Sequence, residues 1–310
     1  MSKNFRNPME HQILEQLWKR TLYPDQVTKA TWNEELETLY RYGIGIEGAM
    51  QYLFFEKPDF EQFYKWVTSR EVVPLTEDIN STADVLTEAD LLFWEENGYL
   101  VLKNAISEED CQATVQAIWT FLGLQPEDRD GWYRQHEEQR GLMLTFSDHP
   151  ILNKNRSSER IRKAYEQLYR SDKIYKTIDK VSFNPPETDS YHFLGSPLHW
   201  DVSLKQPIPY GIQGLLYLTD CGPEDGAFHC VPGFHREIGN WMAGLKEGEN
   251  PRNVALQTLK PIPIVGNAGD FVIWHQALPH CASANHGAAP RMVQYLTYFP
   301  EQYETATEWI

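Results

Sequence analysis

The feature that most constrains the fold is a change in the pattern of residues after Lys173. From there on, short apolar segments alternate with turns that contain Pro and Gly. The segments that we interpret as strands are 176–183, 198–204, 211–219, 227–231, 254–260, 270–274 and 291–299. Many short strands separated by turn signals are typical of a β-sandwich or jelly roll. The pattern therefore predicts a mainly β core with a helical layer.

The N-terminal region has a helical pattern instead. An apolar helical face that begins at Ile13 recurs to about residue 70, and Pro24 is expected to separate the first two helices. We predict that residues 1–86 form a helical extension that packs on the core, with 71–86 as a polar linker, and that 87–310 form the main domain. The extension carries no chemical motif, so a packing layer is preferred over a dimer contact or a substrate lid.

Helix caps and one strand are predicted between these regions. Thr87 and Ser107 each begin a capping pattern, and a short apolar strand at 98–102 lies between the two helices that they start. A further helix is predicted near 159–171, while 125–160 is interpreted mainly as a loop. Helices are therefore expected to precede the strand-rich core.

The composition argues against several classes of protein. The formal net charge is −16, and so negative a surface repels nucleic-acid phosphates and anionic membranes. The sequence has no apolar run of about 18 residues and no signal-peptide pattern at its start. Its four cysteines include no C-x-x-C pair, which argues against a disulfide scaffold or a zinc finger. We expect a cytoplasmic monomer or homodimer that binds a small molecule, with no nucleic acid and no membrane as partner.

The first chemical motif is Leu198-His199-Trp200-Asp201. On a strand, residues i and i+2 point to the same face, so the imidazole of His199 and the carboxylate of Asp201 would lie side by side. One such pair is a weak signal, because His-x-Asp also occurs by chance.

A third ligand can come from the segment that starts at Gly269-Asp270. An apolar strand follows this turn, and His280 lies just past its end. A lone histidine there is more often structural than a metal ligand. Together with His199 and Asp201, however, it completes a set of two histidines and one carboxylate, which suits non-haem Fe(II) because coordination positions stay open. Zinc more often takes a closed tetrahedral set or a mixture of histidine and cysteine.

Arg291 begins an apolar strand on which Val293, Tyr295 and Thr297 share its face. A guanidinium that faces inward needs an anionic partner, because a buried unpaired charge is very costly. A dicarboxylate co-substrate supplies one when Arg binds its distal carboxylate and its 2-oxo acid end chelates the metal. Taken alone, Arg291 is equally compatible with a protein carboxylate as its partner.

In combination these motifs resemble the phytanoyl-CoA dioxygenase (PhyH-like) family over roughly residues 90–300. The segments that carry the resemblance are Phe93–Leu102, His199-Trp200-Asp201, Leu218-Thr219-Asp220, Asp225-Gly226-Ala227-Phe228, Val231-Pro232-Gly233-Phe234-His235, Gly269-Asp270, His280 and Arg291. The resemblance implies a double-stranded β-helix of the cupin-like kind and an Fe(II)- and 2-oxoglutarate-dependent dioxygenase that uses O2. It also implies His199, Asp201 and His280 as metal ligands and catalytic residues. His280 is preferred to His275 chiefly because His280 lies eleven residues before Arg291.

The same resemblance suggests which other residues line the site. Arg291 would bind 2-oxoglutarate, with Gln213, Leu215 and Tyr217 on the inward face of their strand and Thr297 nearby. Leu215 stands where the family often has Trp, so this wall is expected to be reshaped. His235 matches a structural position. The candidates for contact with the primary substrate, each weighed against a simple packing role, are Trp200, Phe228, His229, Trp241 and His275.

The resemblance implies oxidation of an unactivated C–H bond, with release of succinate and CO2. Because Asp201 is present, a halogenase is not expected. Hydroxylation, desaturation, cyclisation and fragment removal stay open. A small polar metabolite or natural-product intermediate is preferred as substrate over a fatty acyl-CoA, because CoA phosphates favour a basic entrance. A non-catalytic metal-binding jelly roll is a further alternative, but it leaves Arg291 unexplained.

Overall fold

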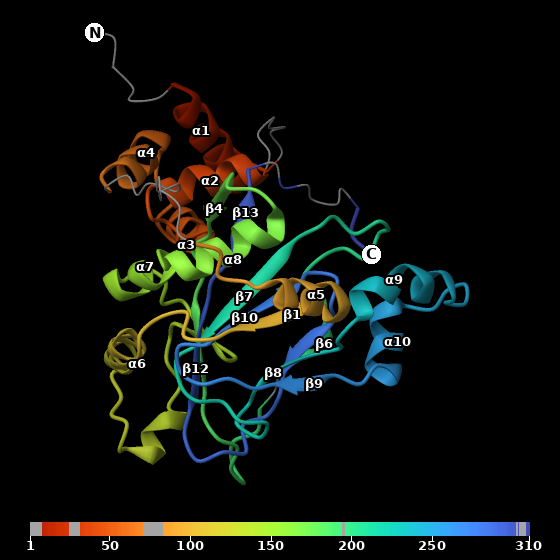
Figure 1. Ribbon diagram of the computed structural model, residues 1–310. Coiled ribbons are helices and arrows are strands. Elements are labelled where there is room, and N and C mark those ends of the chain that lie inside the picture. The colour runs from red at the N-terminus through yellow and green to blue at the C-terminus, as the bar shows by residue number, and fades with distance from the viewer. Residues whose placement is uncertain (1–7, 25–31, 71–82, 194–195, 302, 304–307) are drawn as a thin grey trace. The chain divides into compact units, whose positions relative to one another are not determined.

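A computed structural model of the chain describes residues 8–24, 32–70, 83–193, 196–301, 303 and 308–310 (Figure 1). Its contacts divide the chain into two compact units. One unit comprises Met1–Asp78 with Tyr175–Asp179, and the other comprises Ile79–Ile174 with Lys180–Ile310. Each unit has an apolar core of its own. Most of the predicted linker lies outside the described residues.

The described part of the first unit is helical, as predicted. Its helices are α1 (Pro8–Leu22), α2 (Trp32–Arg41), α3 (Ile46–Glu56) and α4 (Phe60–Thr68). The apolar faces of the helices form one core, whose fully buried members include Leu14, Leu17, Leu39, Leu53, Phe63 and Val67. Asp59 and Gln62 form a capping box that starts α4. The helix α1 ends two residues before Pro24, in agreement with the expected helix break.

The second unit contains two antiparallel sheets within its described residues. The larger sheet consists of β1 (Tyr99–Leu102), β2 (Gln139–Arg140), β3 (Met143–Leu144), β5 (Val181–Asn184), β7 (Ile212–Tyr217), β10 (Phe271–His275) and β12 (Arg291–Tyr295). Its strand order is β1-β10-β7-β12-β5-β3-β2. The smaller sheet consists of β6 (Ser196–His199), β8 (Phe228–Cys230), β9 (Ile262–Ile264) and β11 (His280–Ala282), in the order β6-β11-β8-β9. Two further strands are β4 (Ile174–Lys176) and β13 (Tyr298–Pro300).

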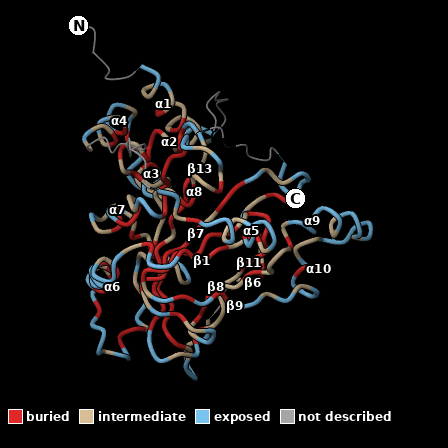
Figure 2. The backbone as a smooth tube through the Cα atoms, viewed as in Figure 1, coloured by how far each residue is buried: buried red, intermediate tan, exposed pale blue. Residues whose placement is uncertain are grey.

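The two faces of the larger sheet pack against different partners. Along β7, Leu215 and Tyr217 join a core cluster that also contains Phe228 and Ile264 of the smaller sheet. The alternate residues of β7 join a cluster that is covered by helices. Figure 2 shows buried backbone gathered along the strands of this unit. The side chains of β7 and β12 that face the smaller sheet are therefore the ones that can line an internal site.

Helices flank the sheets of the second unit. They are α5 (Glu88–Asn97), α6 (Glu108–Leu122), the 3₁₀ helix η1 (Arg129–Tyr133), α7 (Pro150–Arg156), α8 (Glu159–Tyr169), α9 (Phe234–Ala243) and α10 (Pro251–Thr258). The predicted caps are confirmed, because the side chains of Thr87 and Ser107 accept hydrogen bonds at the starts of α5 and α6. No helix in the described parts of the chain is long and apolar enough to cross a membrane.

Several element predictions were wrong in their local detail. Residues 254–260 lie mainly in helix α10 rather than in a strand. Asn250 caps this helix and Pro251 opens it, a start signal that outweighed the apolar spacing. The strand predicted at 291–299 is interrupted between β12 and β13, and the loop predicted at 125–160 contains α7 and the β2–β3 hairpin. The mainly β, jelly-roll class of the core is confirmed.

Candidate active site

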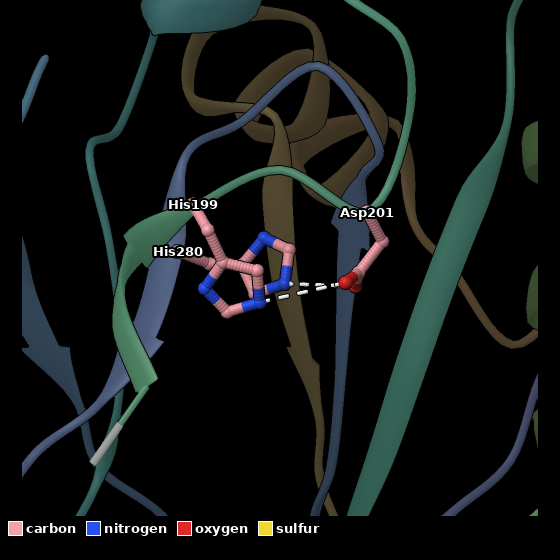
Figure 3. Close-up of side chains that lie close together, drawn as sticks. All are labelled: His199, Asp201 and His280. Carbon is pink, nitrogen blue, oxygen red and sulfur yellow. Dashed lines mark hydrogen bonds and ion pairs between the residues drawn. The ribbon is translucent and has the colours of Figure 1, made fainter. Parts of the chain in front are cut away.

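His199, Asp201 and His280 lie next to one another (Figure 3). His199 ends β6, His280 begins β11, and the antiparallel pairing of the two strands places them opposite each other. One possible ligand atom from each of the three residues lies within 4.8 Å of the other two. Nε2 of His199 is 3.4 Å from Oδ1 of Asp201, and Nε2 of His280 is 3.1 Å from Oδ2. The pairing of β6 with β11 thus brings together possible metal ligands that are far apart in the sequence.

Asp201 reaches this group from a turn, not from the strand that the sequence predicted at 198–204. The strand β6 ends at His199, and the next residues are held by Arg252 of α10. Its Nη1 donates to the carbonyl oxygen of Trp200 at 2.8 Å, and its Nη2 donates to that of Val202 at 2.9 Å. Arg252 therefore fixes the peptides on both sides of Asp201. The role of Arg252 was not predicted, because no local motif links a helical arginine to a turn about fifty residues earlier.

The two histidines are oriented by backbone carbonyl groups. Nδ1–H of His199 donates to the carbonyl oxygen of Pro197 at 2.8 Å, and Nδ1–H of His280 donates to that of Leu278 at 3.1 Å. A carbonyl can only accept, so Nδ1 of each ring carries a proton, and Nε2, which faces Asp201, is the nitrogen that can bind a metal. This arrangement is common for metal-binding histidines, because the second nitrogen fixes the ring.

Asp201 is in turn oriented by Gln213. Nε2 of Gln213 donates to Oδ2 of Asp201 at 2.8 Å. Oε1 of Gln213 accepts a hydrogen bond of 3.0 Å from Nε1 of Trp274, which fixes which end of the amide faces the carboxylate. The expected inward face of β7 thus includes Gln213, but its amide contacts Asp201.

The charges of the three residues are coupled. Burial alone would raise the pKa of Asp201, yet the hydrogen bonds from His199, His280 and Gln213 hold that pKa well below its usual range. Burial would lower the pKa of His199, but its hydrogen bond to Asp201 and the charge of that carboxylate raise it. For both residues, the hydrogen bonds and opposite charges shift the pKa more than burial does. The group therefore favours an ionised carboxylate, which is the form that binds metal ions.

The donor set of these residues fits iron. Two imidazole nitrogens and one carboxylate leave several coordination positions free, which is the arrangement of non-haem Fe(II) oxygenases. The side chain of Asp201 is 49% exposed whereas that of His280 is 7% exposed. The group is therefore open on the carboxylate side, where further ligands can approach.

Arg291 is buried without an ionic partner among the described residues. Its residue is 1% exposed, its Nη2 donates to Oγ of Ser182 at 3.2 Å, and its Nε is buried without a hydrogen bond. Among the residues that the structure describes, no carboxylate pairs with it. A buried guanidinium without an ionic partner lowers the stability of the fold unless an anion binds to it.

A chain of contacts leads from Arg291 to the histidines. Arg291 lies two residues before Val293 on β12, so the two share a face, and Val293 pairs with Tyr217 of β7. The hydroxyl of Tyr217 accepts from the backbone N–H of Phe228 at 3.0 Å and donates to the carbonyl oxygen of Ile264 at 2.7 Å. The ring of Phe228 stacks on His280 with 5.7 Å between ring centroids. Arg291 and the histidines therefore border the same interior.

Thr297 lies outside β12, the strand that carries Arg291. Because β12 ends at Tyr295, strand alternation alone does not place Thr297 beside Arg291. The carbonyl oxygen of the preceding Leu296 accepts a hydrogen bond of 3.3 Å from the hydroxyl of Tyr165 in α8.

Three of the candidate substrate residues pack against other aromatic rings of the fold. Trp200 is 2% exposed, and its Nε1 donates to the carbonyl oxygen of Ala277 at 2.9 Å. Trp241 packs against Trp200, with 6.3 Å between their ring centroids. Phe228 is 4% exposed and lies between Trp274 and His280.

The remaining histidines lie away from Asp201. His229 neighbours Cys230, the residue that faces His280 across the strand pair, so its side chain points to the opposite face. His275 follows Trp274 in β10 and therefore also points away from the interior. Its ring contacts His235 at 5.2 Å. The fold thus brings His280, and not His275, to His199 and Asp201.

Two facing antiparallel sheets with two histidines and one carboxylate between them define a non-haem iron oxygenase of the double-stranded β-helix class. Comparison with known families gives a narrower assignment. The family described as "Phytanoyl-CoA dioxygenase (PhyH)" matches residues 94–293, which is more than half of the chain. The chain therefore belongs to the PhyH family.

Individual relatives are distant but cover most of the chain. A phytanoyl-CoA dioxygenase-like protein of Dictyostelium discoideum is 24% identical and covers 67% of this chain and 74% of its own length. The ectoine dioxygenase of Bordetella bronchiseptica is 23% identical, with shares of 70% and 76%. The crystal structure of HygX from Streptomyces hygroscopicus, with nickel and 2-oxoglutarate bound, is similar with a TM-score of 0.51 at 16% identity, with shares of 71% and 90%. The protein is accordingly a 2-oxoglutarate-dependent non-haem iron dioxygenase, and its cofactors are Fe(II), 2-oxoglutarate and O2.

Proposed function

We propose that His199, Asp201 and His280 hold the Fe(II) and that Arg291 binds the distal carboxylate of 2-oxoglutarate. The observation that carries this proposal is the buried Arg291, which has a hydroxyl but no carboxylate as partner in the described part of the chain. A dicarboxylate that spans from the metal to Arg291 would neutralise that charge. The same molecule would complete the metal coordination through its 2-oxo acid end.

The substrate is proposed to be a small polar metabolite or natural-product intermediate. Among the relatives, one is an ectoine dioxygenase, and HygX has also been crystallised with hygromycin B. Both names point to polar small molecules. Bound Fe(II) and 2-oxoglutarate would supply the oxidising chemistry for a C–H bond, with succinate and CO2 as co-products.

The residues of this chain would supply geometry. Gln213 and the two carbonyl groups behind the histidines would hold the three donors in place, and Arg252 would hold the turn that carries Asp201. The apolar surroundings of His280, which include Phe228 and Trp274, would restrict water on that side. These contacts support a site whose three ligand side chains are held in position before the metal binds.

The decisive experiment measures succinate formation from 2-oxoglutarate with Fe(II) under air. Purified wild-type protein should form succinate, and the rate should rise when the correct substrate is supplied from a metabolite panel. His199→Ala and Asp201→Ala should abolish the reaction, while the surface variant Arg236→Gln should retain it. Succinate formation that survives Asp201→Ala would refute the metal assignment.

We also propose a cytoplasmic location, and we assign different roles to the two parts of the chain. The four cysteines are free thiols, which supports a reducing compartment, and the net charge of −16 disfavours nucleic acid and anionic membranes as partners. We assign catalysis to residues 87–310, because α5 and all the residues named above fall there, and regard residues 1–86 as an extension. The protein would act as a monomer or homodimer.

A further inference from the structure

The second unit contains a cavity of about 890 Å³. Its walls come from η1 and the following β2–β3 hairpin, from the segment after β5, and from single residues of β6, β11 and β12. The volume is within the range of about 300–1,000 Å³ that is usual for small-molecule sites. Its lining includes Tyr133, Arg134, Arg140, Tyr191, Ser196, Ala282 and Tyr295.

Strand geometry connects this cavity to the site of the proposed function. Ala282 lines the cavity and lies two residues after His280 on β11, so both point to the same face. Tyr295 lines it as well, on the same face of β12 as Arg291. Ser196, which pairs with Ala282, extends the wall along β6. The cavity therefore lies along the strand faces that carry His280 and Arg291, although neither residue lines it.

Aromatic rings form much of the cavity wall. Tyr133 ends η1 and Tyr191 lies in the segment after β5, and their ring centroids are 5.2 Å apart. Both are partly buried, and burial raises the pKa of each, so their hydroxyls stay protonated and can donate hydrogen bonds. Trp132 and Phe193 add further aromatic surface. Such walls favour a ligand that contains a flat ring.

One cationic group of the wall, Arg140, has no carboxylate partner among the residues that the structure describes. Nη1 of Arg140 donates to the backbone oxygens of Glu137 and Gln139, and within the described parts of the chain it forms no ion pair. The other arginine of the wall, Arg134, is paired with Asp128 at 3.0 Å. Backbone contacts at one nitrogen leave the remaining donors of Arg140 available for a planar anion.

We propose that this cavity binds the primary substrate, and that the substrate is a ring-bearing anion. Its ring would pack against Tyr133 and Tyr191, and its carboxylate or phosphate would bind Arg140. This inference rests on the proposed function, since it assigns the substrate class of the same site. None of the substrate residues expected from the sequence (Trp200, Phe228, His229, Trp241 and His275) lines the cavity.

The test measures binding by calorimetry on the full chain loaded with nickel and saturated with 2-oxoglutarate, so that no turnover occurs. The probes are phenylacetate, the neutral phenylacetamide and phenyl phosphate. The wild type should bind phenylacetate or phenyl phosphate at least about fivefold more tightly than phenylacetamide, since an accessible arginine–anion pair is worth roughly 1 kcal/mol. Whichever anion binds more tightly identifies the group on the substrate.

Variants separate the two parts of the proposal. Arg140→Gln should abolish the preference for the anion, whereas Arg140→Lys should retain part of it. Tyr191→Ala should weaken the binding of the charged probes and of the neutral probe to the same extent. Arg236→Gln is the matched control: this exposed arginine of α9 does not line the cavity, so the preference should persist.

Equal binding of charged and neutral probes by the wild type would overturn the inference, as would an anion preference that survives Arg140→Gln. The proposed function is tested separately by titrating 2-oxoglutarate into the nickel-loaded protein. If 2-oxoglutarate binds but the probes show no preference, only the substrate class is wrong. If the probes behave as expected but 2-oxoglutarate does not bind, the co-substrate assignment fails instead.

Discussion

Gln213 donates a hydrogen bond of 2.8 Å to Oδ2 of Asp201 while its own oxygen accepts one of 3.0 Å from Trp274. The carboxylate is thereby held by a residue of the opposite sheet, so its direction does not depend on the turn alone. Partners of this kind commonly set metal affinity, because they fix the ligand before the ion arrives.

Gln213→Leu should weaken metal binding about 10–100-fold, as is usual when the partner of a ligand is lost. The measurement is a competition titration of Ni(II) or Fe(II) against a chelator under anaerobic conditions. Trp274→Phe removes only the outer hydrogen bond and should have a smaller effect. If metal affinity stays unchanged and only the KM for 2-oxoglutarate rises, then Gln213 acts on the co-substrate and not through Asp201.

Arg291→Leu should stabilise the protein without 2-oxoglutarate but remove the stabilisation that 2-oxoglutarate gives. Without 2-oxoglutarate, removal of a buried unpaired guanidinium should raise the free energy of unfolding, by about 1–4 kcal/mol if the new side chain packs well. With 2-oxoglutarate and nickel, the stabilisation that the ligand gives the wild type should disappear. Thermal unfolding with and without 2-oxoglutarate measures both effects. A variant that keeps the full ligand-induced rise in Tm would show that Arg291 does not bind the co-substrate.

His280→Gln and His275→Gln form a matched pair for the third metal ligand. The first should lose metal binding and succinate formation, because it removes a nitrogen that lies 3.1 Å from Asp201. The second should retain metal binding, because His275 points to the other face of β10. Metal content after dialysis against a limiting concentration of nickel distinguishes the two. Loss of metal in His275→Gln alone would reverse the assignment.

His275 should make the ligand-free protein sensitive to acid. Burial, with a smaller effect of His235, lowers the pKa of His275 to about 3 in the folded state, whereas the unfolded value is about 6.5. Between these values the unfolded state binds a proton that the folded state does not, so stability falls as the pH is lowered from 6.5 towards 3. From pH 6.5 to 5 this costs up to about 2 kcal/mol. Urea unfolding at both pH values should show a smaller loss in His275→Gln than in the wild type.

Arg252→Met should weaken metal binding several-fold while the fold is kept. The guanidinium holds the carbonyl oxygens of Trp200 and Val202, and without it the turn around Asp201 has fewer constraints. Chelator competition measures the effect, and Arg236→Gln serves as the control for loss of a positive charge. An unchanged metal affinity in Arg252→Met would mean that the turn is held by its other contacts.

The sequence alone determined the class of fold and the chemical types at the site. Helix starts at Thr87 and Ser107 were predictable, because a capping box depends on residues three positions apart. The inward face of β7 was predictable as well, because side chains alternate along a strand. The pairing of His199 and Asp201 was recognised through residue types and the family resemblance, although the strand that was expected to carry both ends at His199.

Only the tertiary structure decided which distant residues meet. His280 lies beside His199 because β11 pairs with β6 in one register, and Arg252 reaches the turn at Asp201 because α10 is folded against β6. Register and helix placement depend on the packing of whole faces, so they leave no local pattern in the sequence. The same reason applies to the cavity, because Tyr133 of η1, Arg140 of β2 and Tyr191 after β5 meet only in the folded chain. The ligand types could thus be predicted from the chain, whereas the neighbours that orient them and the substrate wall could not.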